Sequence, residues 1–130
     1  MPKVTQIAVF LQNKPGALAR ICSTLGKAGV NISALLAPEA KARGKVRLLV
    51  DNPDKAKEAL NTAKIRFSEE EVIALNLDNR PGALGEVAEK LAQSKINIRY
   101  ACATTTEGVA KATVIIGVRD ADKALGVLGE

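Results

Sequence analysis

The sequence predicts an α+β fold of two tandem βαββαβ units, the second of which lacks its last strand. Residues 13–32 match residues 79–98 at 8 of 20 positions without a gap, whereas two unrelated segments would share about one or two. Within each copy, apolar residues run as in a strand, then take helical spacing, then run as in a strand again. The repeat therefore predicts two domains, at 1–68 and 69–130.

The first repeat begins with a predicted strand at Thr5–Leu11, which is rich in β-forming residues. Pro15 suits the first position of the following helix, because its missing N–H is not needed there. Apolar residues keep helical spacing up to Gly29, which is expected to end that helix in the left-handed conformation. A second strand is predicted at 30–36.

The remainder of the first repeat supplies a third strand and a second helix. A polar loop at 38–44 leads to the strand at 45–50. Asn52 is the predicted N-cap of the helix, with Pro53 at its first position. Residues 64–67 are a candidate for a short fourth strand.

The second repeat follows the same order, from a strand at 72–77 to a helix that begins near Leu84. Further strands are predicted at 96–104 and 111–118, and Asp120 is the expected N-cap of a last helix. This order is typical of the ferredoxin-like fold, in which one antiparallel sheet carries both helices on one face.

One irregularity concerns the junction between the repeats and the edge of the second sheet. The acidic run Glu69–Glu71 is predicted to be a solvent-exposed junction. Without a fourth strand in the second repeat, one side of the strand at 72–77 is left without a partner, which favours unwanted pairing. We expect residues 64–67 or a partner chain to cover this edge, or else the edge to fray.

The composition argues against several classes of partner. The net charge is +5, but Lys and Arg are interleaved with acids, and two Phe and one Tyr offer few surfaces for base stacking. Nucleic-acid binding is therefore not predicted. The sequence has no secretory signal and no apolar run of membrane-spanning length, so no membrane association is predicted and a cytoplasmic location is expected.

The residues that support catalysis are sparse. The chain has no His, and Cys22 and Cys102 form no CxxC motif, so we expect no metal site, no cofactor and two buried, reduced thiols. There is no Ser-His or Cys-His pair and no glycine loop of the phosphate-binding type. The protein is therefore predicted not to be an enzyme.

The repeated pattern resembles the ACT domain. In both copies an Asn-x-Pro-Gly-Ala-Leu turn, Asn13–Leu18 and Asn79–Leu84, follows a strand and opens a helix, and Asn-Ile enters the next strand. The resemblance covers essentially the whole chain. The repeated pattern is also similar to that of the serine-binding domain of phosphoglycerate dehydrogenase. It implies a ferredoxin-like module that binds an amino acid at interfaces between units, commonly paired side by side.

The same resemblance implies where a ligand binds. Glycine at a helix N-terminus lets a carboxylate approach free N–H groups, and Asn supplies both a donor and an acceptor. The candidate ligand-binding residues are Asn13, Pro15, Gly16, Ala17, Leu18, Asn31 and Ile32, with Asn79, Pro81, Gly82, Ala83, Leu84, Asn97 and Ile98. Leu11 and Leu77 stand where the serine site has a His, which favours a more apolar ligand than serine.

Simpler interpretations of these residues stay open. A Pro-Gly turn at a helix start needs no ligand, and Asn31 and Asn97 could only hydrogen-bond turn backbone. The leading hypothesis is a regulatory module that binds a small amino acid and modulates a partner in amino-acid metabolism, such as a biosynthetic enzyme, as a homodimer. The alternative is a ligand-free assembly or regulatory subunit of such an enzyme.

Overall fold

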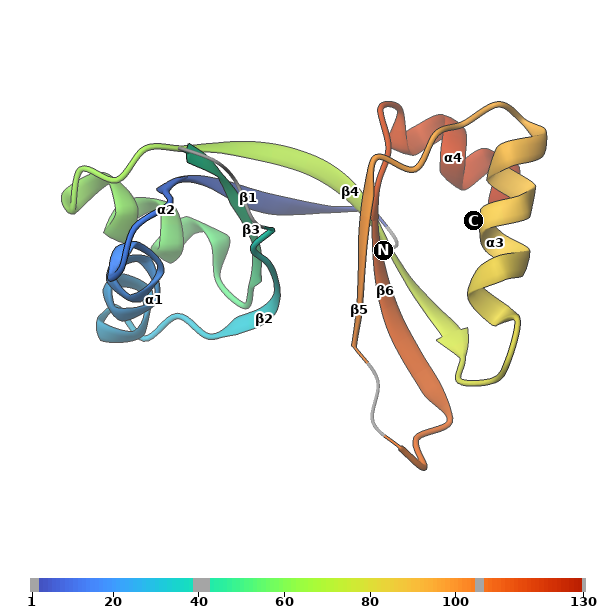
Figure 1. Cartoon of the computed structure of the whole chain (residues 1–130), viewed down its shortest axis with the longest axis horizontal. Coiled ribbons are helices and arrows are strands. Elements are labelled where there is room, and N and C mark those ends of the chain that lie inside the picture. Colours follow the sequence, from blue (N-terminus) through green and yellow to red (C-terminus); the bar gives the residue numbers. More distant parts are fainter. Residues whose placement is uncertain (1–2, 39–42, 105–106, 130) are drawn as a thin grey trace. The chain divides into compact units, whose positions relative to one another are not determined.

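The computed structural model describes residues 3–38, 43–104 and 107–129, and within them the chain forms six strands and four helices (Figure 1). The strands are β1 (Lys3–Gln12), β2 (Ile32–Leu36), β3 (Arg43–Val50), β4 (Phe67–Asp78), β5 (Tyr100–Thr104) and β6 (Lys111–Gly117). The helices are α1 (Ala17–Lys27), α2 (Pro53–Thr62), α3 (Ala83–Gln93) and α4 (Ala121–Leu128). The α+β prediction is confirmed.

The structure divides into two compact units. The first unit is Thr5–Glu70, and the second unit is Met1–Val4 together with Glu71–Glu130. The strand order is β2-β3-β1-β4 in the first unit and β1-β4-β6-β5 in the second, since β1 and β4 each contribute residues to both. The predicted limits at 1–68 and 69–130 stay a sequence-based description of the duplication.

The core of the first unit lies between its sheet and the helices α1 and α2, which Figure 1 shows on one side of the strands. Ile7 and Val9 of β1 face Val46 and Leu48 of β3 in antiparallel register, and all four are buried. Asn52 caps α2 as predicted, because its Oδ1 accepts a hydrogen bond from the Lys55 N–H at 3.1 Å.

The second unit repeats this arrangement with α3 and α4. Ile73 and Leu75 of β4 pair with Ile116 and Val114 of β6, and all four belong to its buried core. Asp120 caps α4 as predicted, with its Oδ1 3.1 Å from the Lys123 nitrogen. In the described residues no strand follows α4.

The prediction of a separate short strand at 64–67 is wrong, whereas Glu69 and Glu71 of the acidic run are exposed as predicted and the division between the two units falls after Glu70. Phe67–Asp78 is one continuous strand, and the acidic run lies inside it. The Glu70 side chain is only 18% exposed, since Arg47 on β3 pairs with its carboxylate at 2.9 Å and Gln6 donates to the same carboxylate at 3.3 Å. A charge run that alternates faces along a strand can be neutralised by neighbouring strands, which spacing alone does not reveal.

The expectation for the open edge of the second sheet is also wrong. β1 is the hydrogen-bonded neighbour of β4, and its first residues belong to the second unit. Lys3 holds this segment in place through ion pairs with Glu71 at 3.3 Å and with Asp122 at 3.0 Å. The start of the chain, and not residues 64–67 or a partner chain, takes the place of the missing last strand.

Helix α1 begins two residues later than predicted, at Ala17, and Pro15 lies in the turn before it. The strands β2 and β5 also begin later than expected, at Ile32 and Tyr100. The residues between each helix and the next strand hydrogen-bond to the helix end instead of joining the strand. The Ile96 N–H, for example, donates to the Leu91 carbonyl at 2.9 Å and so ends α3. β3 begins at Arg43, and residues 39–42 of the predicted loop lie outside the description.

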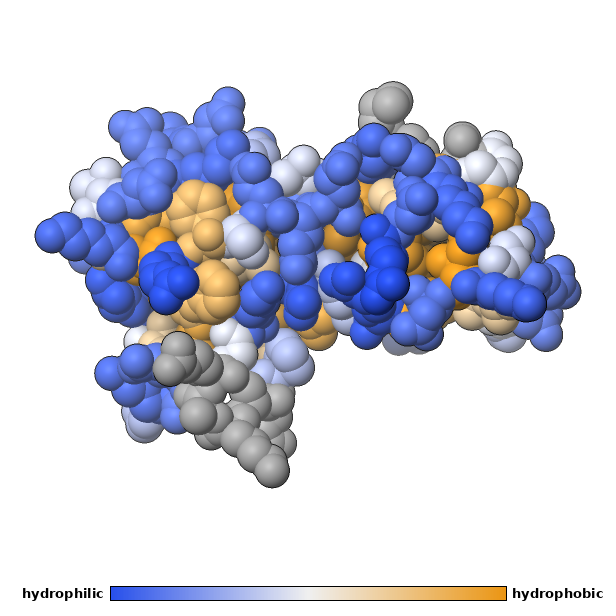
Figure 2. Space-filling view, turned by 90° about the horizontal axis from the view of Figure 1, so that it is seen from above, coloured by the Kyte–Doolittle hydropathy of each residue, from blue (hydrophilic) through white to orange (hydrophobic). Residues whose placement is uncertain are grey.

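The surface drawn in Figure 2 is mostly hydrophilic, with small apolar areas between charged and polar side chains. The large apolar side chains that remain exposed are Phe10, Leu18, Leu35, Leu84 and Val109. One of them, Phe10, belongs to the candidate site.

Candidate functional site

The first Asn-x-Pro-Gly turn joins β1 to α1 through a left-handed glycine. Gly16 has φ 87° and is the N-cap of α1, with no side-chain cap and no acid in the first turn of the helix. A non-glycine residue is strained at such a φ. The Ala17 N–H donates to the Lys14 carbonyl at 3.3 Å. Because no side chain caps the N–H groups that follow, the positive end of the helix dipole stays open to an anion.

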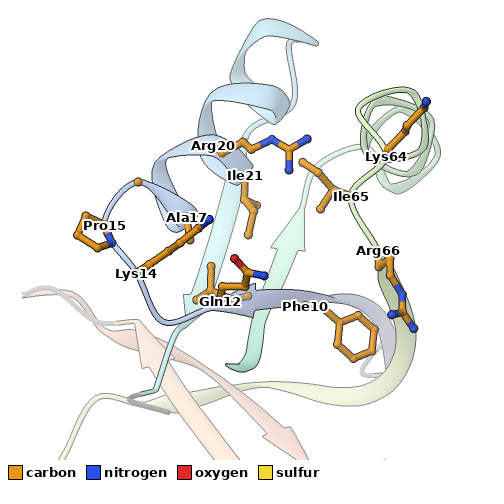
Figure 3. Close-up of a pocket in the computed structure, with 12 residues that line it drawn as sticks. Phe10, Gln12, Lys14, Pro15, Ala17, Arg20, Ile21, Lys64, Ile65 and Arg66 are labelled. Atoms are coloured by element: carbon orange, nitrogen blue, oxygen red, sulfur yellow. The ribbon is translucent and has the colours of Figure 1, made fainter. Parts of the chain in front are cut away.

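A cavity of about 610 Å³ opens at this turn, wholly within the first unit (Figure 3). Its walls are the end of β1, the turn, the first residues of α1 and the segment that joins α2 to β4. The lining residues are Phe10, Leu11, Gln12, Lys14, Pro15, Gly16, Ala17, Arg20, Ile21, Lys64, Ile65 and Arg66. Its volume lies within the range of small-molecule sites, about 300–1,000 Å³.

The lining is strongly cationic. Lys14, Arg20, Lys64 and Arg66 line the cavity, whereas no Asp or Glu does. Among the described residues, no acid forms an ion pair with any of these four. All four side chains are exposed, so solvent and salt screen each charge, but together they give the lining a positive potential that favours an anion.

Local contacts hold two of the cations in place. Arg20 Nη2 donates to the Ala63 carbonyl at the end of α2, at 2.8 Å, so its guanidinium bridges the two helices. Arg66 lies 5.1 Å from the centre of the Phe10 ring, a separation typical of a cation–π contact. In Figure 3 the Arg20 head group extends from α1 toward Ile65.

Lys64 occupies a position that glycine usually fills. It follows the last turn of α2 with φ 59°, and the Ile65 N–H bonds to the Leu60 carbonyl at 2.9 Å. This is the helix-ending motif whose left-handed residue is most often glycine. Lys95 has the same φ of 59° after α3, so the strained lysine is found at both helix ends but lines the cavity only in the first unit.

The second Asn-x-Pro-Gly turn has the same backbone and different charges. Gly82 has φ 86° and caps α3, whose first turn contains Glu86. Arg80 donates to Glu86 at 2.7 Å and lies 3.9 Å from Asp78, which also pairs with Lys111 at 2.6 Å. The positive charges at this turn are therefore matched by acids of the same chain.

These pairs shift the titration of their members. The hydrogen bond from Lys111, aided by its charge and by that of Arg80, holds the pKa of Asp78 below its ordinary value. The hydrogen bond to Glu86 is the main cause of the raised pKa of Arg80, and Asp78 adds to it. All of these groups are exposed, so solvent screens their interactions.

The structure brings together only some of the predicted residues of the first copy. Pro15, Gly16 and Ala17 line the cavity, whereas Asn13 and Leu18 are exposed outside its lining. The other two predicted residues lie where β2 begins. The Asn31 N–H donates to the Asp51 side-chain carboxylate at 3.0 Å, and its carbonyl accepts from the Asp51 N–H at 3.1 Å. Ile32 packs against the core.

In the second copy Asn79 holds the chain segment before β6. Its Nδ2 donates to the Val109 carbonyl at 2.9 Å, and its N–H donates to the Ala110 carbonyl at 2.9 Å. The remaining predicted residues divide by exposure: Pro81, Gly82, Leu84 and Asn97 are exposed, Ala83 is buried, and Ile98 packs against the core. A cavity of about 270 Å³ in this unit is lined by other residues, among them Leu75 and Lys90.

Sequence reasoning missed Arg20, Lys64 and Arg66 as residues that line the cavity. Arg20, Lys64 and Arg66 are far apart in the chain, and only Arg20 belongs to the repeat alignment. There a signal was present, because Arg20 aligns with Glu86 at the offset of 66 residues. The two copies of the motif therefore carry opposite charges at this position.

Other chemistry finds little support in the described residues. No group of three or more His, Cys, Asp or Glu among them could hold a metal ion. Cys22 and Cys102 are free thiols of intermediate exposure, so the prediction of fully buried thiols is wrong, and burial raises the pKa of Cys102. None of the helices described combines the length and apolar character needed to cross a membrane.

The fold and the duplicated turn define a tandem α+β module, and comparison with known families gives its class. A family model of the ACT domain pair matches residues 2–128, so the chain belongs to the ACT domain pair family. Among curated proteins, no sequence matches the chain.

Solved structures agree with this assignment. Protein BT0572 from Bacteroides thetaiotaomicron is 31% identical, with a TM-score of 0.90 over 98% of this chain and 88% of that one. The ligand-free regulatory subunit of aspartate kinase from Thermus thermophilus is 20% identical, with a TM-score of 0.66 over 96% and 89%. The same subunit from Thermus flavus is 18% identical, with a TM-score of 0.61 over 99% and 95%. At these two lower identities the likeness shows the fold.

Proposed function

We propose that the protein is a regulatory module that binds a small amino acid at the first Asn-x-Pro-Gly turn and modulates a partner in amino-acid metabolism. The observation that supports this most directly is the cavity at Gly16, which joins an uncapped helix N-terminus to four cations without an acid. A carboxylate bound there receives backbone N–H groups and a positive field together.

Membership of the ACT domain pair family and the fold shared with regulatory subunits of aspartate kinase support the regulatory role. In this proposal the protein is not itself an enzyme, and occupancy of the site shifts a population of conformations that the partner senses. The expectation that ligands lie at interfaces between ACT-like units stays a prediction, and so does a cytoplasmic location.

A homodimer is part of the proposal. β2 is an edge strand of the first unit, with one hydrogen-bonded neighbour, and the residues Ile32–Leu36 include no charged side chain. Edge strands of this kind readily pair with another chain. Light scattering on the purified protein measures the mass directly, and a single monomeric species at every concentration would exclude this part of the proposal.

The alternative function is a ligand-free assembly subunit of a biosynthetic enzyme. The second turn favours it, because Arg80 is neutralised by Asp78 and Glu86 without any ligand. If both turns only hold helices in place, the protein acts through its surface and not through small molecules.

A thermal-shift scan of the twenty amino acids at millimolar concentration separates the two functions. A ligand at 100 times its Kd stabilises the folded protein by about 2.7 kcal/mol. A response to one or a few amino acids that is weakened by Gly16→Val at the cavity and unchanged by Gly82→Val at the matching turn supports the proposed sensor. Melting temperatures that stay the same with all twenty would sink the sensor and favour assembly.

A further inference from the structure

The charge of the cavity restricts the class of ligand more narrowly than the turn does. A neutral amino acid brings one carboxylate and one ammonium group, so its net charge is zero. The cavity offers four cations and no carboxylate, so such a ligand would leave its ammonium without an acidic partner and most of the cations unmatched. A ligand with a second negative group fits this lining better.

The cations lie on separate walls of the cavity. Lys14 belongs to the turn, Arg20 to α1, and Lys64 with Arg66 to the segment between α2 and β4. Figure 3 shows Lys14 beside the helix start, Arg20 extended toward Ile65, and Lys64 and Arg66 on the opposite side, with the Lys64 head group directed away from the other labelled side chains. Because Lys14 and Arg20 come from different elements, an extended ligand with a charged group at each end is the kind that we expect to engage both.

The second turn provides an internal comparison. Asp78 and Glu86 stand at the repeat positions of Gln12 and Arg20, and both pair with Arg80, at 3.9 and 2.7 Å. In that copy the chain itself therefore places two carboxylates around the basic residue of the Asn-x-Pro-Gly turn. In the first copy both acids are absent and three further cations are present.

We infer that the first turn binds a small dicarboxylate, an extended molecule with a carboxylate at each end. One carboxylate lies at the N-terminus of α1 beside Lys14. The other lies against Arg20 and the Lys64–Arg66 wall, where a guanidinium offers paired donors to a carboxylate. The amide of Gln12 can accept a hydrogen bond from an amino group, so the class includes acidic amino acids and dicarboxylates without an amine.

This inference rests on the proposed function only in taking the cavity as the ligand site, and one experiment tests the two separately. Isothermal titration calorimetry of the whole protein compares glutamate, glutarate, glutamine and inorganic phosphate. Glutamine matches glutamate in size and has one carboxylate fewer. We expect glutamate or glutarate to bind at least tenfold more tightly than glutamine or phosphate, with an affinity that falls as salt is added.

Charge-neutral variants then locate the second carboxylate. Arg20→Gln and Lys64→Gln should each weaken dicarboxylate binding about tenfold, since a hydrogen bond to a charged group contributes about that much. Lys95→Gln is the matched control, because Lys95 has the same backbone conformation as Lys64 at the end of α3, and its affinity should not change.

The outcomes distinguish the two claims. Glutarate binding without any amino-acid binding supports the dicarboxylate and removes the amino-acid function. Glutamine binding as tightly as glutamate, with Arg20→Gln unchanged, overturns the dicarboxylate and leaves the amino-acid function standing. Phosphate binding more tightly than either dicarboxylate, or no binding by any probe, also overturns the inference.

Discussion

The two Asn-x-Pro-Gly turns share a backbone and differ in charge. Gly16 and Gly82 have φ of 87° and 86°, and the N–H four residues later bonds to each glycine carbonyl at 3.0 Å in both turns. Around this common frame, the first turn has Arg20 where the second has Glu86. The motif therefore determines the conformation of the turn, and the residues beside the motif determine its charge.

A second pair of positions shows a similar divergence in packing. In the first unit Ala34 pairs with Leu49 across β2 and β3, whereas in the second Tyr100 pairs with Gly117 across β5 and β6. The larger residue of the pair is Leu49 on β3 in the first unit, but it is Tyr100 on β5 in the second. A Cβ atom at Gly117 would overlap the Tyr100 ring. The two units therefore fill the same sheet position with a large side chain from different strands.

The largest effect is expected from a substitution in the Tyr100–Gly117 pair. Gly117→Leu should destabilise the protein by about 3 kcal/mol, because overpacking at a filled site forces side chains and backbone apart. Urea unfolding measures the change. The double variant Tyr100→Ala with Gly117→Leu, which copies the pair of the first unit, should regain most of the loss; a double variant no more stable than Gly117→Leu alone would contradict the packing account.

Exchanging the charges tests the comparison of the turns. Arg20→Glu places the acid of the second turn in the first, and it should weaken anion binding by about 2 kcal/mol, the contribution of a charged hydrogen bond. Calorimetric titration with the ligand found for the natural protein measures this. Glu86→Arg serves as the reciprocal variant and should leave binding at the first turn unchanged. Equal losses in both variants would show that the two turns do not differ in function.

A smaller effect is expected at the two strained lysines. Lys64→Gly and Lys95→Gly should each stabilise the protein by up to about 1 kcal/mol, because glycine adopts the left-handed conformation without strain. Thermal unfolding measures the gain. Only Lys64→Gly should also weaken ligand binding, since only Lys64 lines the cavity; loss of affinity in Lys95→Gly would speak against the site.

The smallest effect concerns acid. The pKa of Asp78 is lowered from 3.8 in the folded protein, so its ion pair contributes stability above the unfolded pKa, and this contribution disappears as the pH falls through the lower folded value. Melting temperatures recorded down to about pH 2.5 should fall less steeply for Asp78→Asn than for the natural protein. Gln12→Ala at the matching position of the first turn should leave the slope unchanged.

The sequence by itself determined the duplication, the α+β class and both side-chain helix caps, because repeats, periodicity and capping are local. It also placed the two glycine turns at the starts of their helices. The sequence did not predict the late starts of β2 and β5, since the residues before these strands, such as Ile96, donate backbone hydrogen bonds to the preceding helix. Propensity scales do not weigh that competition.

Only the tertiary structure decided the rest. That Phe67–Asp78 is one strand, and that Lys3 helps the start of the chain to complete the second sheet, depends on pairing between distant segments. The cationic cavity likewise joins Arg20 to Lys64 and Arg66, more than forty residues away in the chain. Charges at such separations meet only when the helices pack, so their sum at the first turn is a property of the fold.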